Sequence, residues 1–158
     1  MLDYYFIGKE KVITTDKNNY NWLVIDSSDT KEIEQVIEKY RLPKDIFVGT
    51  SLPEEVSRIE ELVGTNLNHP ISLVLLNLSN QEQKIENRLM PISFIYSDEL
   101  LISCIDKKTD FFDRVLAKHG NKINSFETLI AYSVLNIYTH YVKELTEMKK
   151  RIDSLDQE

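Results

Sequence analysis

Cysteine is almost absent from this chain of 158 residues, since Cys104 is the only one. A single thiol cannot form an intramolecular disulfide, so the sequence fits a reducing compartment. The thiol lies in the apolar run 100–105, where a buried structural cysteine is expected rather than a nucleophile.

Glycine and histidine are also scarce. Four glycines supply no phosphate-binding loop of the G-x-G-x-x-G or G-x-x-x-x-G-K-[ST] type, and no G-x-S-x-G nucleophile elbow occurs. The spacing of His69, His119 and His140 puts no two imidazoles on one helical face, so a zinc site is not expected. We therefore expect a protein that is not an enzyme and has no catalytic or cofactor-binding residues.

Long hydrophobic runs and clustered positive charge are lacking too. The longest apolar runs, such as 71–78, are less than half of the roughly 20 residues that span a bilayer as a helix. The N-terminus does not have the pattern of a signal peptide. The net charge is −7 and the longest basic cluster is only 149–151, which argues against a nucleic-acid partner. The 42% hydrophobic residues suffice for the core of one soluble, acidic domain.

What the chain does contain is a long helical pattern at its C-terminal end, residues 124–158. Neither glycine nor proline follows Gly120. At about 1.5 Å per residue this helix would be about 50 Å long, more than a small domain needs to cover its core. Its apolar residues alternate at spacings of four and three, which predicts a seam facing a partner helix. The seam consists of Val134, Tyr138, Tyr141, Leu145, Met148, Ile152 and Leu155.

The first third of the chain alternates strands and short helices. Asp29, followed three residues later by Glu32, is a capping-box pattern that opens a helix with an apolar face. Pro43 can open a second short helix over residues 44–47. Strands are expected at 4–7 and 12–14, as a hairpin, and at 22–25.

The middle of the chain is richer in strands. Residues 54–62 are ambiguous, because an apolar residue at every third position slightly favours a helix while the segment leads into a turn at Gly64. A helix over 109–119 is expected to stop at Gly120. Because strands precede a largely helical C-terminal part, the predicted class is α+β. Three clearer strands are expected at 71–78, 90–96 and 100–105, the last two forming a hairpin.

Carboxylates occur in several close pairs, which could share a hard cation such as Mg²⁺ or Ca²⁺. A solvated surface or helix-cap role is the favoured interpretation for each pair, and none matches an EF-hand loop. The pairs are Asp26 with Asp29, Glu54 with Glu55, Glu60 with Glu61, Asp110 with Asp113, and Asp153 with Asp156.

The order of these segments resembles the CorA-type magnesium/divalent-cation transporter family over nearly the whole chain. Segment 53–60 is similar to the family's acidic "D-E-x-P-R-I-E" stretch, and 90–95 to its "P-V-S-I-I" strand. Residues 100–103 are similar to the "L-I-T" strand, and 129–135 to the "L-L-y-a-i-L" start of a long helix. The ending Ile152-Asp153-Ser154-Leu155-Asp156 resembles "I-D-x-L-E".

The resemblance implies the N-terminal cytoplasmic domain of a homopentameric channel, an α/β/α sandwich around a mixed, largely antiparallel sheet. Residues 1–123 would be the α/β domain and 124–158 the start of a helical arm, with the stalk and membrane helices beyond residue 158. The implied partners are further copies of the chain, divalent cations and its own membrane domain at the cytoplasmic face of the cell membrane. The implied function is cation sensing and gating through regulatory Mg²⁺ between carboxylates of neighbouring subunits. In the family, residues 58–60 would begin a strand, which overrules the helical periodicity there.

The sequence also departs from the family pattern. Leu52 replaces an aspartate that often precedes the proline, and Ser57 replaces the proline before the arginine. Glu54 and Glu55 match acidic positions, but a match in alignment does not establish coordination, so no metal ligand is assigned. A second interpretation therefore stays open, a stand-alone cytosolic interaction module that oligomerises through its C-terminal heptad helix.

Overall fold

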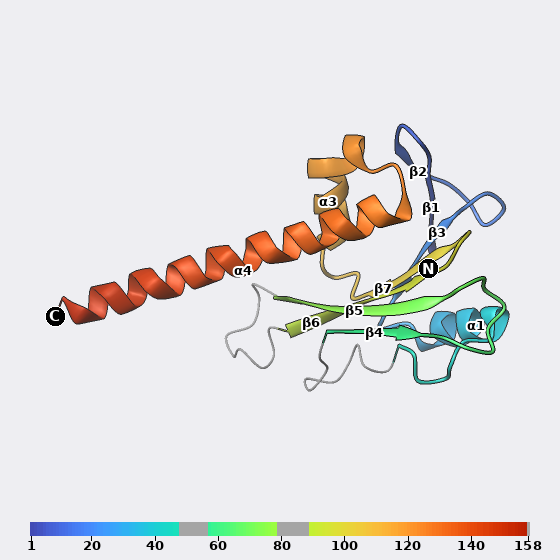
Figure 1. Cartoon of the computed structure of the whole chain (residues 1–158), viewed down its shortest axis with the longest axis horizontal. Coiled ribbons are helices and arrows are strands. Elements are labelled where there is room, and N and C mark those ends of the chain that lie inside the picture. Colours follow the sequence, from blue (N-terminus) through green and yellow to red (C-terminus); the bar gives the residue numbers. More distant parts are fainter. Residues whose placement is uncertain (48–56, 79–88, 158) are drawn as a thin grey trace.

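The fold is an α/β/α sandwich in which helices cover both faces of one mixed sheet (Figure 1). The computed structural model describes residues 1–47, 57–78 and 89–157. The predicted α+β class with a long C-terminal helix is confirmed. The described strands are β1 Asp3–Ile7, β2 Val12–Thr14, β3 Trp22–Asp26, β4 Arg58–Glu61, β5 Ile71–Leu78, β6 Leu89–Tyr96 and β7 Leu101–Ile105. The described helices are α1 Thr30–Tyr40, α3 Phe111–His119, the 3-10 turn η2 Gly120–Lys122 and α4 Phe126–Asp156.

The sheet has the order β2-β1-β3-β7-β6-β5-β4. Within it, β3 and β7 pair in parallel, from Trp22 opposite Leu101 to Asp26 opposite Ile105, and the other neighbouring strands pair antiparallel. All five residues of β7 are buried. The predicted hairpins β1–β2 and β6–β7 are both present.

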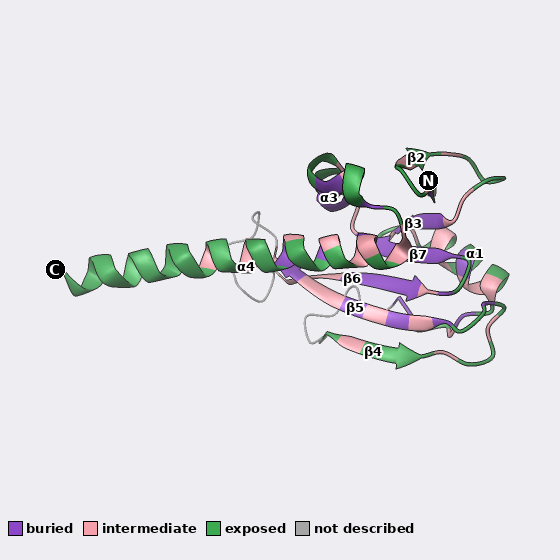
Figure 2. Ribbon diagram, turned by 45° about the horizontal axis from the view of Figure 1, so that its top comes forward, coloured by how far each residue is buried: buried purple, intermediate pink, exposed green. Residues whose placement is uncertain are grey.

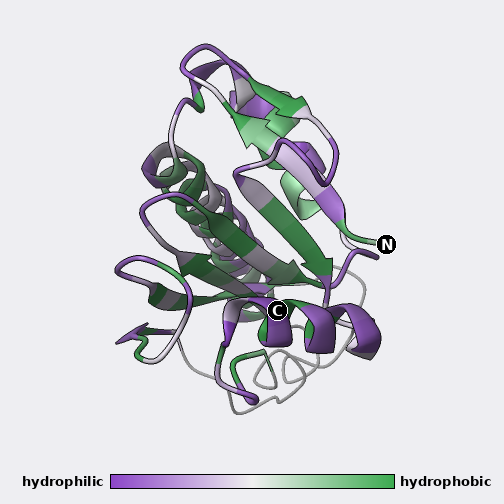
Figure 3. Cartoon of the chain, turned by 90° about the vertical axis from the view of Figure 1, so that its right-hand side faces the viewer, coloured by the Kyte–Doolittle hydropathy of each residue, from purple (hydrophilic) through white to green (hydrophobic). Residues whose placement is uncertain are grey.

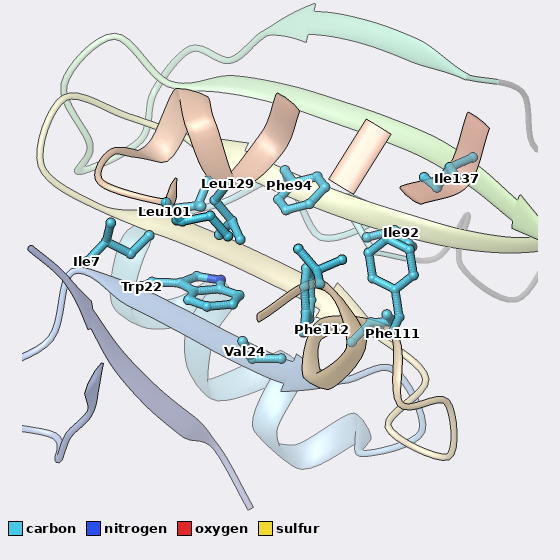
Figure 4. Packing of buried hydrophobic residues seen from close by; sticks show 13 residues of the cluster. Ile7, Trp22, Val24, Ile92, Phe94, Leu101, Phe111, Phe112, Leu129 and Ile137 are labelled. Carbon is cyan, nitrogen blue, oxygen red and sulfur yellow. The ribbon is translucent and has the colours of Figure 1, made fainter. Parts of the chain in front are cut away.

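Alternation along the strands assigns residues to the two faces of the sheet. Trp22 and Val24 of β3 face α3 and α4, whereas Leu23 and Ile25 face the layer that contains α1. On the first face, Phe112 packs edge-on against Trp22 and Phe94, with ring centroids 5.1 and 5.9 Å away (Figure 4). The central strands are hydrophobic and most connecting loops are hydrophilic, as expected for a buried sheet (Figure 3).

Helix α1 begins where the sequence predicted. The Asp29 side chain accepts a hydrogen bond from the Glu32 backbone N–H at 3.1 Å. The reciprocal half of a capping box is replaced by an ion pair, because the Glu32 carboxylate binds the Met1 amino group at 2.6 Å. Arg41 closes the helix in the left-handed region with φ 52°.

Two local predictions need comment. The expected helix over 44–47 is wrong, since these residues form a turn with a hydrogen bond from the Ile46 N–H to the Pro43 carbonyl at 3.1 Å. The turn places both Ile46 and Phe47 in the core on the α1 side of the sheet. The strand interpretation of 58–60 is confirmed by β4, and Ile59 is 72% exposed there. Segment 54–56 lies outside the described residues.

Candidate functional site

The candidate site is the surface of α4, because this helix alone extends well beyond the sheet (Figure 1). Its start is fixed by a capping box between Ser125 and Thr128. The Tyr96 hydroxyl of β6 also donates a hydrogen bond to the Glu127 carboxylate at 2.5 Å. With 31 residues, α4 is roughly 46 Å long.

The first half of α4 is docked on the sheet. Leu129, Ser133 and Ile137, spaced by four residues, are its buried positions. The small side chain of Ser133 satisfies its hydroxyl by donating to the Leu129 carbonyl at 2.8 Å, so the helix can lie close to the strands. The Tyr141 hydroxyl donates to the Leu76 carbonyl of β5 at 3.3 Å. Apart from Tyr141, the docking residues are therefore ones that the heptad analysis did not select.

The predicted seam lies beside this docked stripe and is mostly uncovered. Figure 2 shows the outer part of α4 as continuously exposed. Every residue from 145 to 157 is exposed. Apart from the half-buried Tyr141, the seam residues are 43–68% exposed: Val134, Tyr138, Leu145, Met148, Ile152 and Leu155. Such a contiguous apolar stripe is typical of a protein contact surface.

At its inner end the seam enters a groove of about 340 Å³ between α4 and β5. The groove is lined by Ser57, Leu75, Leu76, Val134, Ile137, Tyr138 and Tyr141. Val134, Tyr138 and Tyr141 belong to both the seam and the groove. The two features therefore form one continuous apolar surface on one side of the molecule.

The predicted carboxylate pairs do not converge. Asp110 binds Arg114, with Oδ1 2.7 Å from Nε and 2.6 Å from Nη2, and this hydrogen bond lowers the pKa of Asp110. Asp26 accepts hydrogen bonds from the Ser28 backbone and hydroxyl, and Asp29 caps α1. These contacts are structural roles, in line with the favoured interpretation of the pairs.

The remaining pairs lie apart from these. Glu60 is 3.4 Å from Arg58 on β4, and Asp153 and Asp156 are exposed on the outer part of α4. Glu54 and Glu55 lie outside the described residues. Within residues 1–47, 57–78 and 89–157, no three His, Cys, Asp or Glu side chains are placed to hold one metal ion. The described part of one copy thus does not fit a regulatory Mg²⁺ by itself.

The single thiol is buried, and two of the histidines have a ring or ion-pair partner. Cys104 is fully buried in the face toward α1, and burial raises its pKa to about 12, so the thiol stays protonated at neutral pH. The imidazole of His119 stacks on Tyr132 with ring centroids 4.5 Å apart. His69 pairs with Asp98 at 2.8 Å, which raises the pKa of His69.

The sequence analysis missed two features of this surface. It did not select the docking stripe, although Ser133 among larger apolar residues is a signal for close helix approach. It also did not bring together Asn77, Lys108 and Arg114, which line one cavity. Asn77 is the polar exception near the end of the apolar run 71–78, and that exception was the available signal.

Taken together, the fold and the α4 surface define a class: an α/β/α domain with a docked helix that continues as an uncovered arm. None of the helices in the described part of the chain is long and apolar enough to cross a membrane. Residues 17–158 match the sequence profile described as "CorA-like Mg2+ transporter protein". The chain belongs to this family, as its segment order suggested.

Solved structures share the fold. The cytoplasmic domain of ZntB from Vibrio parahaemolyticus matches with a TM-score of 0.74 and 12% identity, over 96% of this chain and 63% of that one. Full-length CmaX matches with a TM-score of 0.78 and 9% identity, over 99% and 50%. The soluble domain of CorA from Methanocaldococcus jannaschii matches with a TM-score of 0.69 and 15% identity, over 99% and 63%. The chain thus spans between half and two thirds of the length of these structures. The search of curated proteins found no match.

Proposed function

We propose that this chain is the cytoplasmic regulatory domain of a CorA-like divalent-cation transporter, which senses cations and gates the channel. In this proposal residues 1–123 are the α/β domain, and 124–158 begin a helical arm that continues toward a membrane domain. The full-length protein would assemble as a homopentamer at the cytoplasmic face of the membrane. The family is one of transporters, which favours a regulatory role over catalysis.

The observation that carries the proposal is the family match over 17–158 together with the uncovered half of α4. A domain that needed α4 only for its own core would not require the exposed residues 145–156. Their apolar seam is typical of a helix that packs against a neighbouring helix. In this proposal residues 124–158 begin a helical arm, and the stalk beside it is that neighbour.

Charge supports a sensor that works between copies. The chain carries a net charge of −7, so identical domains brought together repel one another. A divalent cation held by carboxylates of two copies would offset that repulsion, and its loss would let the domains separate. A site shared between copies is compatible with the scattered carboxylates of a single copy.

The direct test is cation flux through the full-length protein in liposomes. Influx of Mg²⁺ is followed with an internal fluorescent indicator, at micromolar and at millimolar Mg²⁺ on the side of this domain. We expect fast influx at the lower concentration and strongly reduced influx at the higher one. Equal influx at both concentrations would contradict the regulatory role but would not contradict transport by the full-length protein.

A second test separates the proposal from the stand-alone interaction module, which the exposed Leu145, Met148 and Ile152 also favour. We expect residues 1–158 alone to be a monomer or a loose oligomer, because the arm lacks its neighbour. Light scattering at low micromolar concentration measures this. A salt-insensitive pentamer of the isolated chain would contradict the expectation, and a stop codon directly after residue 158 in the native reading frame would favour the stand-alone module.

A further inference from the structure

A small polar cavity lies on the face of the sheet that carries α3 and α4, away from the seam. Its volume is about 100 Å³, and its lining includes Asn77 of β5, Lys108, residues 110–111 at the start of α3, Arg114 and His140 of α4. Since a water occupies about 30 Å³ in the liquid, this space fits a few waters or one small polar group. A drug-sized or nucleoside-sized ligand would not fit inside.

Asn77, which lines this cavity, has one side-chain atom without a hydrogen-bond partner among the described residues. Strand alternation puts Asn77 on the same face as Leu73 and Leu75, which pack against the core below α3 and α4. The residue is 9% exposed, and none of the described residues donates a hydrogen bond to its buried Oδ1. Buried polar atoms without a partner are rare and need an explanation, and a ligand that donates a hydrogen bond is sufficient.

The first turn of α3 adds backbone donors at the same place. Asp110 occupies the N-cap position but its side chain makes no capping hydrogen bond, because the carboxylate is held by Arg114. Backbone N–H groups in the first turn of a nine-residue helix, which starts at Phe111, therefore lack a side-chain cap. Such N–H groups, together with the helix dipole, favour an anion.

The charges around the cavity agree with this preference. Lys108 and Arg114 are positive and Asp110 is negative. The lining is thus net positive on a protein with a net charge of −7. Lys108 is exposed and can reach toward a ligand without disturbing the core.

We propose that this cavity binds a protonated tetrahedral oxyanion of the phosphate class, with Lys108, Arg114 and the first turn of α3 around its charged oxygens and Asn77 Oδ1 accepting a hydrogen bond from its hydroxyl group. Hydrogen phosphate carries such a proton at neutral pH, whereas sulfate has the same shape without one. The site therefore selects phosphate over sulfate. The source is either free phosphate or the terminal phosphate of a nucleotide whose remainder stays outside the cavity. The proposal is independent of cation sensing by the domain.

The test is a titration of the protein with sodium phosphate at constant ionic strength, followed through backbone amide shifts in NMR spectra. We expect saturable shifts for Phe111, Phe112 and Asp113, and a dissociation constant at least about tenfold lower for phosphate than for sulfate. Lys108→Ala should weaken phosphate binding by about tenfold. The matched control is Lys118→Ala, which removes an exposed lysine charge from α3 outside the cavity and should leave binding unchanged.

A second variant, Asn77→Asp, places a negative charge beside the bound anion and should abolish binding through like-charge repulsion. A separate titration uses ATP in place of phosphate. If ATP binds more tightly than phosphate and Lys108→Ala weakens both, the source is a nucleotide. Three results would overturn the proposal: no saturable shifts, equal affinity for sulfate and phosphate, or equal losses in Lys108→Ala and Lys118→Ala. In the first case the Asn77 carbonyl is satisfied by water alone.

Discussion

The two parts of α4 share an apolar helical spacing but have opposite surroundings. The inner segment, 126–144, contains the buried residues Leu129, Ser133 and Ile137, whereas every residue of the outer segment, 145–156, is exposed. Both segments carry apolar residues at helical spacing. The comparison teaches that amphipathic periodicity predicts the helix but not which of its stripes docks, because that depends on side-chain size and on the strands below.

The comparison also bears on helix stability. An isolated helix of about 12 residues is marginal in water, so the outer segment depends on its continuity with the docked part and on any partner it meets. The inner segment instead shares the stability of the whole core. The following experiments separate the two segments, starting with the largest expected difference.

Hydrogen exchange should distinguish the segments most strongly. Inner amides near Leu129 and Ile137 should exchange only through global unfolding, whereas amides of 145–156 should be nearly unprotected. The difference in opening free energy should be about 5 kcal/mol or more. Exchange followed by NMR in dilute, monomeric samples measures it. Equal protection along the whole of α4 in a monomer would show that the comparison is wrong.

Core truncation should be costly on the inner segment only. Leu129→Ala removes a fully buried side chain and should lower the free energy of unfolding by about 2–5 kcal/mol. Leu155→Ala, the same change at a residue 68% exposed, should cost less than about 0.5 kcal/mol. Urea unfolding followed by circular dichroism gives both values. Similar losses in the two variants would mean that the outer segment is packed in solution.

The bond between Tyr96 and Glu127 should give a smaller, pH-dependent effect. The Tyr96 hydroxyl lowers the pKa of Glu127, so this stabilisation is fully present above the ordinary glutamate pKa and is lost as the pH falls through the lowered value. Because Glu127 is exposed, Tyr96→Phe should cost only about 0.5–1 kcal/mol at pH 7. Urea unfolding should give nearly equal stabilities for the two proteins in acid. A difference that persists there would exclude the charged bond as its cause.

The smallest change in folding stability is expected for Leu145→Ser, within about 0.5 kcal/mol. The same substitution removes a seam residue that is 61% exposed, so it should reduce any self-association of the chain. Sedimentation or light scattering at increasing concentration measures this. If neither association nor stability changes, the seam is not a surface through which copies of the chain associate.

Much of the fold could be predicted because it depends on local patterns. The Asp29 cap of α1, the β6–β7 hairpin and the burial of Cys104 follow from residues close in sequence. The helix predicted over 44–47 failed although Pro43 favours a helix start, and Ile46 and Phe47 are buried in the turn found there instead. The strand at 58–61 was correct only through family resemblance, since pairing with β5 overrides the threefold periodicity.

The parts that could not be predicted depend on residues brought together from distant positions. The parallel pair of Trp22 with Leu101, at the middle of the sheet, leaves no local signal. The cavity around Asn77 and Lys108 likewise exists only once β5 and α3 lie on the same face. The heptads found an apolar seam, but the distinction between docked and uncovered stripes required the sheet.

The projecting segment of α4 also works as a lever. From residue 145 to 156 it extends roughly 18 Å past its last half-buried position. A tilt of about 15° at the docked stripe would displace the tip by roughly 5 Å, more than the range of about 4.5 Å over which two side chains stay in contact. A rearrangement at Leu129 and Ile137 too small to change the fold would therefore suffice to exchange one set of neighbours for another at the far end.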